Sequence, residues 1–323
     1  MKKRLLIFSA VLIIIIASIY IFIPARLSIT ESVPVTATQE GTIRMFSNRA
    51  NWYKFWSGSS AINSRSGGSL INPDSSVFCS SDGYNFYIKK ILLNSIELTI
   101  EKNRDSIESA LYILPYQVDS FKLQWTALLP PTNNPIKRIQ NYITCKKLGV
   151  VLKPMLSSMG NMLSKVQTIY DIDIKKDKIP IQQAITTKRY FNQYPSTEII
   201  YSMIDELKKY VDDQGVKQID QPIFNVLSTE GGEFMTQVGL SIDKNIPGND
   251  QYSTKWMMKG GNILTAEVTG DTKKIEWAET QMEQYIADNH RSIIAAPFQM
   301  FITDRRAEKD STKWVTRLYY PVI

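Results

Sequence analysis

The second half of the chain contains an internal repeat, which restricts its fold more than any other feature of the sequence. Residues 196–214 and 271–289 both carry apolar side chains at helical spacing, and they begin 75 positions apart. Ser196 and Gly215 are suited to the start and the end of the first helix. The expected apolar stripes are Ile200, Met203, Ile204, Leu207 and Val211 in the first helix, and Ile275, Ala278, Met282, Tyr285 and Ile286 in the second.

The segments on either side of these two helices repeat as well. QPIFNVL follows the first helix and APFQMFI follows the second, while FMTQVGLSI (234–242) matches WVTRLYYPV (314–322). IPIQQAITTKRYF opens the first half and NILTAEVTG opens the second. Each half therefore has the order strand, helix, strand, strand. Two units of this size predict a pseudo-twofold domain of two β-α-β-β halves, with a cleft where the halves meet.

Several segments of the second half together carry a resemblance to a known family. These are AEVTG before the second helix, the helix ending at Asn289, AAPFQMFITD, and the Pro-Val that ends the closing strand. Residues 172–323 resemble the GyrI-like domain, the effector-binding domain of bacterial multidrug-responsive transcription activators. The resemblance implies binding of small molecules, often lipophilic cations, in a cleft between two β-α-β-β halves. We find no helix-turn-helix pattern ahead of this domain, so we expect no nucleic-acid partner.

The closing strand of the second half carries a charge at its centre. Because side chains alternate along a strand, Arg317 and Tyr319 share one face, and the large residues Leu318 and Tyr320 share the other. The matching strand of the first half has Gln237 at the position equivalent to Arg317. A polar residue at this position in both halves is typical of a cleft floor.

We therefore predict a ligand site on this face. By resemblance, Arg317 replaces a glutamate that meets a cationic ligand in many family members, and Phe301 replaces a frequent tyrosine. An arginine would instead attract a carboxylate, phosphate or sulfate. The alternatives are a surface arginine, or one paired with a carboxylate such as Glu267 or Glu233. The candidate ligand-binding residues are Gln237, Arg317, Tyr319, Met235, Phe301 and Glu267.

The first module, residues 26–168, has several strand-like runs followed by a long segment of helical periodicity, which Gly149 and Pro154 are expected to break or kink. Its distinguishing segments are the first strand before Glu40, the turn Asn51–Trp56, Trp125 in the last strand, and the Met-rich closing helix. They resemble the SRPBCC superfamily, also called START-like or polyketide-cyclase-like. That resemblance implies a helix-grip fold, in which a curved antiparallel sheet holds a long helix around a cavity.

The N-terminus carries a long apolar run. MKKR is followed by residues 5–23, which contain no charge, and then by Pro24. A run of this length predicts an uncleaved transmembrane anchor at residues 1–24, with a cleaved signal peptide as the alternative. The positive-inside rule would keep the N-terminus in the cytoplasm. We therefore expect a single-pass protein of the bacterial inner membrane whose domains are extracytoplasmic.

The predicted fold class is α+β: a helix-grip antiparallel sheet domain, a pseudo-twofold domain of two β-α-β-β halves, and one N-terminal transmembrane helix. One histidine and two cysteines exclude a His/Cys zinc cluster, so we predict no metal and no cofactor. We predict no catalytic residue, because His290 follows a helix end. The favoured function is membrane-anchored binding or sensing of a small apolar or amphipathic molecule. The alternatives are a hydrolase or cyclase that uses a cleft glutamate, Glu267 or Glu276, and a structural adaptor without a ligand.

Overall fold

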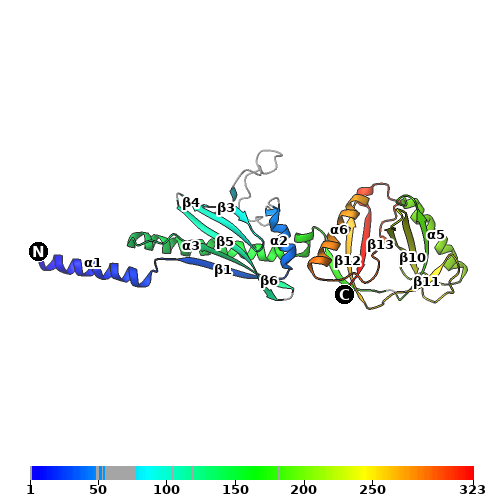
Figure 1. Ribbon diagram of the computed structural model, residues 1–323, viewed down its shortest axis with the longest axis horizontal. Helices are drawn as coiled ribbons and strands as arrows, with labels where there is room; N and C mark the ends of the chain where they lie inside the picture. The colour runs from blue at the N-terminus through cyan, green and yellow to red at the C-terminus, as the bar shows by residue number, and fades with distance from the viewer. Residues whose placement is uncertain are drawn as a thin grey trace. The chain divides into compact units, whose positions relative to one another are not determined.

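The chain forms two compact units, Met1–Ile169 and Tyr170–Ile323. The computed structural model describes residues 2–48, 51–52, 54, 77–103, 105–117, 119–180 and 182–323. Helices and antiparallel strands build both units (Figure 1), which confirms the predicted α+β class. Half of the turn Asn51–Trp56 lies outside the described residues. Within it, Trp52 is buried and stacks on Phe46, with ring centroids 4.7 Å apart.

The first unit is a curved antiparallel sheet with a long helix lying along it (Figure 1). The strand order is β1-β6-β5-β4-β3-β2, so the first strand closes against the last one along the chain. The strands are β1 (Ser28–Val35), β2 (Val77–Ser81), β3 (Tyr84–Ile91), β4 (Ser95–Lys102), β5 (Asp105–Gln117) and β6 (Ser120–Leu128). The helices are α1 (Lys2–Phe22), α2 (Gln39–Ser47), α3 (Pro135–Leu163) and the short α4 (Val166–Tyr170) at the boundary of the units.

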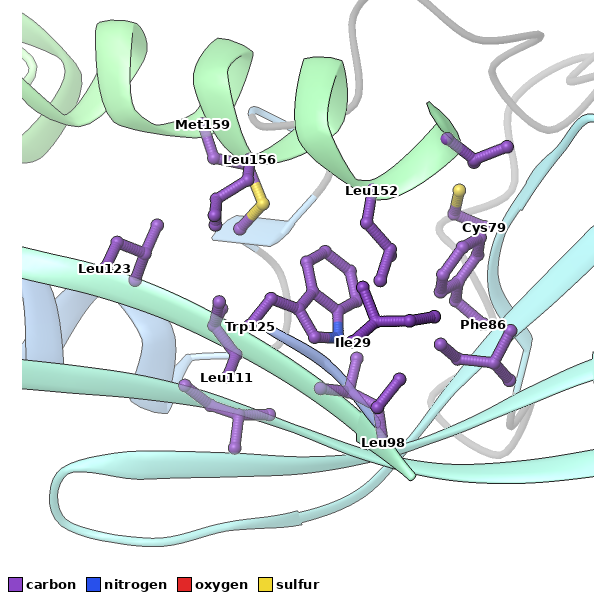
Figure 2. Packing of buried hydrophobic residues seen from close by; sticks show 14 of the residues in the cluster. Ile29, Cys79, Phe86, Leu98, Leu111, Leu123, Trp125, Leu152, Leu156 and Met159 are labelled. Atoms are coloured by element: carbon purple, nitrogen blue, oxygen red, sulfur yellow. The ribbon is translucent and has the colours of Figure 1, made fainter. Parts of the chain in front are cut away.

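Side chains fill the interface between α3 and the sheet. Figure 2 shows Leu152 and Leu156 pointing from α3 toward Trp125 on β6, in a cluster that also contains Phe86 and Leu111. Each of these five residues is at most 1% exposed. Burial of large apolar side chains at roughly 1.5–3 kcal/mol each makes this interface the main source of stability of the first unit.

Helix α3 runs through Gly149 and Pro154 without a break, so of the two predicted outcomes the break is wrong, and the kink stays a prediction. Proline removes one backbone N–H, but the apolar residues on both sides of it are held against the sheet, and this packing keeps the helix together. The helix start is well defined, because the Asn134 side chain accepts hydrogen bonds from the backbone N–H groups of Ile136 and Lys137, and Pro135 occupies the first turn.

The apolar N-terminal run forms α1. Among the residues that the structure describes, no helix combines the length and the apolar character that a membrane span requires. This finding contradicts the predicted transmembrane anchor and the single-pass inner-membrane location, and both predictions are corrected here.

The second unit is an eight-stranded antiparallel sheet with the order β11-β8-β10-β9-β13-β14-β12-β7. Its first half is β8, α5, β9 and β10, and its second half is β12, α6, β13 and β14; β9 and β13 pair at the centre. The bounds are β7 (Ile174–Lys178), β8 (Gln183–Phe191), α5 (Thr197–Asp213), β9 (Ile223–Ser228), β10 (Phe234–Ser241), β11 (Ser253–Trp256), β12 (Asn262–Thr269), α6 (Thr272–Asp288), β13 (Phe298–Phe301) and β14 (Val315–Pro321).

The two helices of the repeat form as the sequence predicts. Ser196 caps α5 by accepting a hydrogen bond from the Ile199 backbone N–H, and Gly215 follows the helix with a φ of 62°. All ten residues of the two expected apolar stripes are buried. In α6 the capping residue is Asp271, which accepts from the backbone N–H of Lys274 at 3.1 Å.

The structure adds an edge strand to each half, exchanged between the halves. β7 precedes the first half in the chain but pairs with β12 of the second, and β11 precedes the second half but pairs with β8 of the first. The connections after β7 and β11 therefore meet: the Ile179 N–H donates to the Gly261 carbonyl, and the Gly260 N–H donates to the Ile179 carbonyl, both at 2.9 Å. This exchange ties the two halves together by their backbones.

Candidate functional site

Arg317 lies on the face of the sheet opposite α5 and α6. Its neighbours Thr316 and Leu318 are fully buried on the helix-covered face, so strand alternation turns Arg317 the other way. Glu267 on β12 lies directly opposite Arg317 in the strand register. Tyr319, two residues along β14, shares the face and is 8% exposed. The structure thus brings together three of the candidate residues.

These residues form a chain of hydrogen bonds. Arg317 donates to Glu267 Oε1 from Nε at 3.0 Å and from Nη2 at 2.5 Å, and Nη1 donates to the Tyr319 hydroxyl at 3.3 Å. The Tyr319 hydroxyl in turn donates to Met300 Sδ at 3.7 Å. The hydrogen bond with Tyr319, and then that with Glu267, raise the pKa of Arg317. The alternative of an arginine paired with a carboxylate is therefore the one that the structure adopts.

A cleft of about 380 Å³ opens beside this pair. Four acidic and three basic side chains line it, so its walls carry both signs of charge. The lining residues are Asp173, Asp177, Asp220, Glu267, Lys175, Lys178, Arg317, Pro180, Ile263, Thr265, Ala266 and Tyr319. Most of the charges other than Arg317 come from β7 and the segment before it, which join this half only through the strand exchange.

Each of the three basic side chains of the cleft already has an ion-pair or hydrogen-bond partner. Lys175 Nζ lies 3.4 Å from Asp173 Oδ2, and Lys178 Nζ donates to Asn262 Oδ1 at 2.7 Å. Both hydrogen bonds that Arg317 donates to Glu267 go to Oε1, and Oε2 accepts none from any residue that the structure describes. The carboxylate of Glu267 therefore has unused hydrogen-bonding capacity at the centre of the cleft.

An apolar cluster adjoins the cleft on the same face of the sheet. Tyr319 belongs to both, because its ring stacks on Phe298 with centroids 4.7 Å apart while its hydroxyl meets Arg317. Burial raises the pKa of Tyr319, so the hydroxyl stays protonated. The cluster consists of Ile179, Ile223, Ile263, Phe298, Met300 and Tyr319, with Met257 packed against it.

The other three candidate residues lie elsewhere. Met235 and Gln237 are on β10, three strand spacings from β14, or about 14 Å away. Gln237 accepts a hydrogen bond from Lys255 Nζ at 3.1 Å. Phe301 is on the opposite face of the sheet, in the core beneath α5, with its ring centroid 4.4 Å from that of Phe224. The structure therefore does not bring these residues to Arg317.

Sequence reasoning missed the contribution of residues 173–178 to the cleft. The alternation of Ile172 and Ile174 with polar residues indicates a strand, and both isoleucines are buried. Alternation alone does not say which strand this segment joins. Of the remaining candidates for chemistry, Glu276 is exposed, and His290 follows the end of α6 with a φ of 52°.

No family model and no curated protein matches the chain. Among solved structures, it is similar to the EcmrR C-terminal domain, with 13% identity, a TM-score of 0.41 and coverage of 47% of this chain and 98% of that chain. A hydrolase from Listeria innocua matches with 10% identity, a TM-score of 0.36 and coverage of 46% and 91%. The Zhui aromatase/cyclase from Streptomyces sp. R1128 matches with 7% identity, a TM-score of 0.27 and coverage of 43% and 94%.

These structural neighbours include a GyrI-like effector-binding domain and an SRPBCC-like aromatase/cyclase. At these identities and TM-scores they describe what the chain is similar to, and they assign it to no family.

Proposed function

We propose that the second unit binds a small amphipathic molecule in the cleft beside Arg317, Glu267 and Tyr319. One observation carries this proposal: the ion pair of Arg317 and Glu267 lies at the boundary between a cleft of about 380 Å³ and an apolar cluster. Ligand sites commonly combine apolar walls with a few fixed polar groups, which supports the proposal.

Oxygen Oε2 of Glu267, which accepts no hydrogen bond from a described residue, favours a ligand that carries a positive charge. Arg317 is neutralised by its hydrogen bonds to Glu267 and has little capacity left for an anion. A ligand with a cationic or hydrogen-bond-donating group would instead bind Glu267 Oε2, while its apolar part packs near Tyr319 and Ile263. We therefore propose a cationic amphiphile rather than the anion that an unpaired Arg317 would favour.

The proposed architecture is a helix-grip module of the SRPBCC type at residues 26–168, followed by a GyrI-like module at residues 172–323. The antiparallel sheet that packs against α3 supports the first assignment, and the two β-α-β-β halves of the second unit support the other. The interface between α3 and the sheet is filled by side chains, so we propose the ligand site for the second module alone.

The proposal is tested by titrating the full-length protein with a quaternary-ammonium dye and with a sulfonated dye of similar size. We expect the cationic dye to bind more tightly. Glu267→Gln should weaken its binding about tenfold or more, because a charge-assisted hydrogen bond contributes roughly 1.5–3 kcal/mol. Arg317→Gln should strengthen it, because Glu267 then loses its internal partner.

Glu230→Gln is the matched control, since Glu230 lies on the exposed hairpin between β9 and β10. It should leave both affinities unchanged. Non-saturable binding of both dyes to the wild type, or the same affinity in Glu267→Gln as in the wild type, would refute the proposal.

A further inference from the structure

A second charged group is buried on the opposite, helix-covered face of the sheet. Arg305 lies in the hairpin between β13 and β14 and is 7% exposed. Its guanidinium carbon is 3.9 Å from the ring centroid of Phe301 and 4.6 Å from that of Trp314. Aromatic faces stabilise a guanidinium by cation–π attraction, but they supply no hydrogen-bond acceptor.

The guanidinium of Arg305 has few acceptors. Nη2 donates to the Thr316 hydroxyl at 2.7 Å, whereas the buried Nε has no partner among the described residues. No carboxylate in the described part of the chain forms an ion pair with it. A buried charge that is neither paired nor fully hydrogen-bonded is costly, so an arginine in this state calls for an explanation.

The neighbouring Arg306 has the opposite environment. It lies 3.3 Å from Asp304 and 3.0 Å from Asp205 on α5, and its side chain is half exposed. The ion pair with Asp205 holds the hairpin on α5, as does the hydrogen bond from the Arg305 backbone N–H to the Tyr201 hydroxyl at 3.1 Å. The attachment of the hairpin is therefore explained without the guanidinium of Arg305.

The surroundings of Arg305 are aromatic and partly open. Tyr194, which is 48% exposed, lies close enough for its hydroxyl to interact electrostatically with Arg305. Burial lowers the pKa of Arg305 to about 10, which is still high enough for the group to be charged at neutral pH. The hairpin that carries Arg305 is longer than the corresponding hairpin of the first half, so the site has no counterpart there.

We propose that Arg305 binds an oxyanion, the carboxylate or phosphate group of a small molecule, beside Phe301 and Trp314 on the helix-covered face. The anion would accept hydrogen bonds from the unused N–H groups and would compensate the buried charge. This site lies on the other face of the sheet from the cleft beside Arg317, and the proposal does not depend on the function proposed for that cleft.

The test uses the full-length protein with inorganic phosphate and with acetate as probes, each against chloride at equal ionic strength. Calorimetric titration should detect saturable binding of at least one of the two. The preferred anion then identifies the chemistry, phosphate or carboxylate. Arg305→Gln should weaken this binding about tenfold or more. Arg306→Gln, which removes a paired and half-exposed guanidinium, should bind as the wild type does.

A second measurement needs no loss-of-function variant, in case Arg305→Gln does not fold. In the wild type, the Nε–H resonance of Arg305, assigned by through-bond correlation to its own backbone, should shift on titration with the bound anion, and that of Arg306 should not. The absence of saturable binding of both anions, or an Nε–H resonance of Arg305 that neither anion moves, would overturn the proposal.

Discussion

Arg317 and Glu267 face each other across β14 and β12 as a directly opposed pair in the strand register, with Nε and Oε1 3.0 Å apart. Their side chains are 38% and 56% exposed. The pair explains how a charge is accommodated in the middle of the closing strand. It also leaves the second carboxylate oxygen of Glu267 without a hydrogen bond from any described residue.

The ion pair between Arg317 and Glu267 should contribute little to stability, because solvent screens both partners. A double-mutant cycle of Arg317→Gln and Glu267→Gln should give a coupling energy of about 0.2–1 kcal/mol at low salt, and less at high salt. Urea unfolding of the four proteins measures it. A coupling that is several times larger and unaffected by salt would mean that the pair is shielded from water.

Two glycines of α3 should respond in opposite ways to alanine. A Cβ at Gly160 would lie 2.9 Å from Val33 Cγ1, whereas one at Gly149 would meet its nearest neighbour, Ile29, only at 3.9 Å. Gly149→Ala should stabilise the protein by about 0.5–1 kcal/mol through helix propensity. Gly160→Ala should destabilise it by about 1–3 kcal/mol, because the stiff Val33 must shift. Equal thermal shifts in both variants would contradict the close contact between α3 and β1.

Glu279 on α6 should make stability depend on pH. Burial raises the pKa of its carboxyl above the ordinary 4.5, with smaller contributions from Glu283 and Glu276. The native state therefore holds a proton that the unfolded state releases, and stability falls as the pH rises from about 4.5 through the raised pKa of Glu279. Glu279→Gln should remove this loss, so its stability relative to the wild type should grow across that window.

The exposed Glu230→Gln serves as the control for the pH series, measured by urea unfolding at each pH. Its stability difference from the wild type should stay constant. If the Glu279→Gln difference is equally flat, the carboxyl of Glu279 is solvated rather than buried.

The two cysteines should react as separate thiols. Cys79 is buried, with 2% of its surface exposed, whereas Cys145 is partly exposed. Burial raises the pKa of Cys145, so a thiol reagent should modify it slowly at neutral pH and faster as the pH rises. One thiol per native chain should react, and Cys145→Ser should abolish that reaction. Reaction of two thiols in the native protein would contradict this assignment. So would a native protein in which no thiol reacts until a reductant is added.

Local patterns in the sequence determined the helices of the second unit. Ser196, Gly215 and the apolar stripes act within a few residues of one another, so their effect is visible in the order of amino acids. The same holds for the two faces of β14, because side-chain alternation needs no partner strand. The repeat itself predicted two β-α-β-β halves, and the sheet contains them.

Partner strands were decided only by the tertiary structure. Nothing in residues 173–178 indicates that they cross to the second half, yet that pairing supplies much of the cleft wall. Alternation assigns a residue to one of two faces but does not say which strands are adjacent. For this reason alternation alone predicts Gln237 beside Arg317, whereas the strand order puts it about 14 Å away.

Phe301 and Glu267 illustrate the same limit. The resemblance predicts Phe301 beside Arg317, but its register with Thr316 puts it on the helix-covered face. Glu267 was one of two carboxylates considered for Arg317, and the register of β12 against β14 selects it over Glu233. Helix caps and stripes depend on residues near in sequence. Strand order and register depend on contacts between distant segments, and these are set by how the whole sheet buries its apolar face.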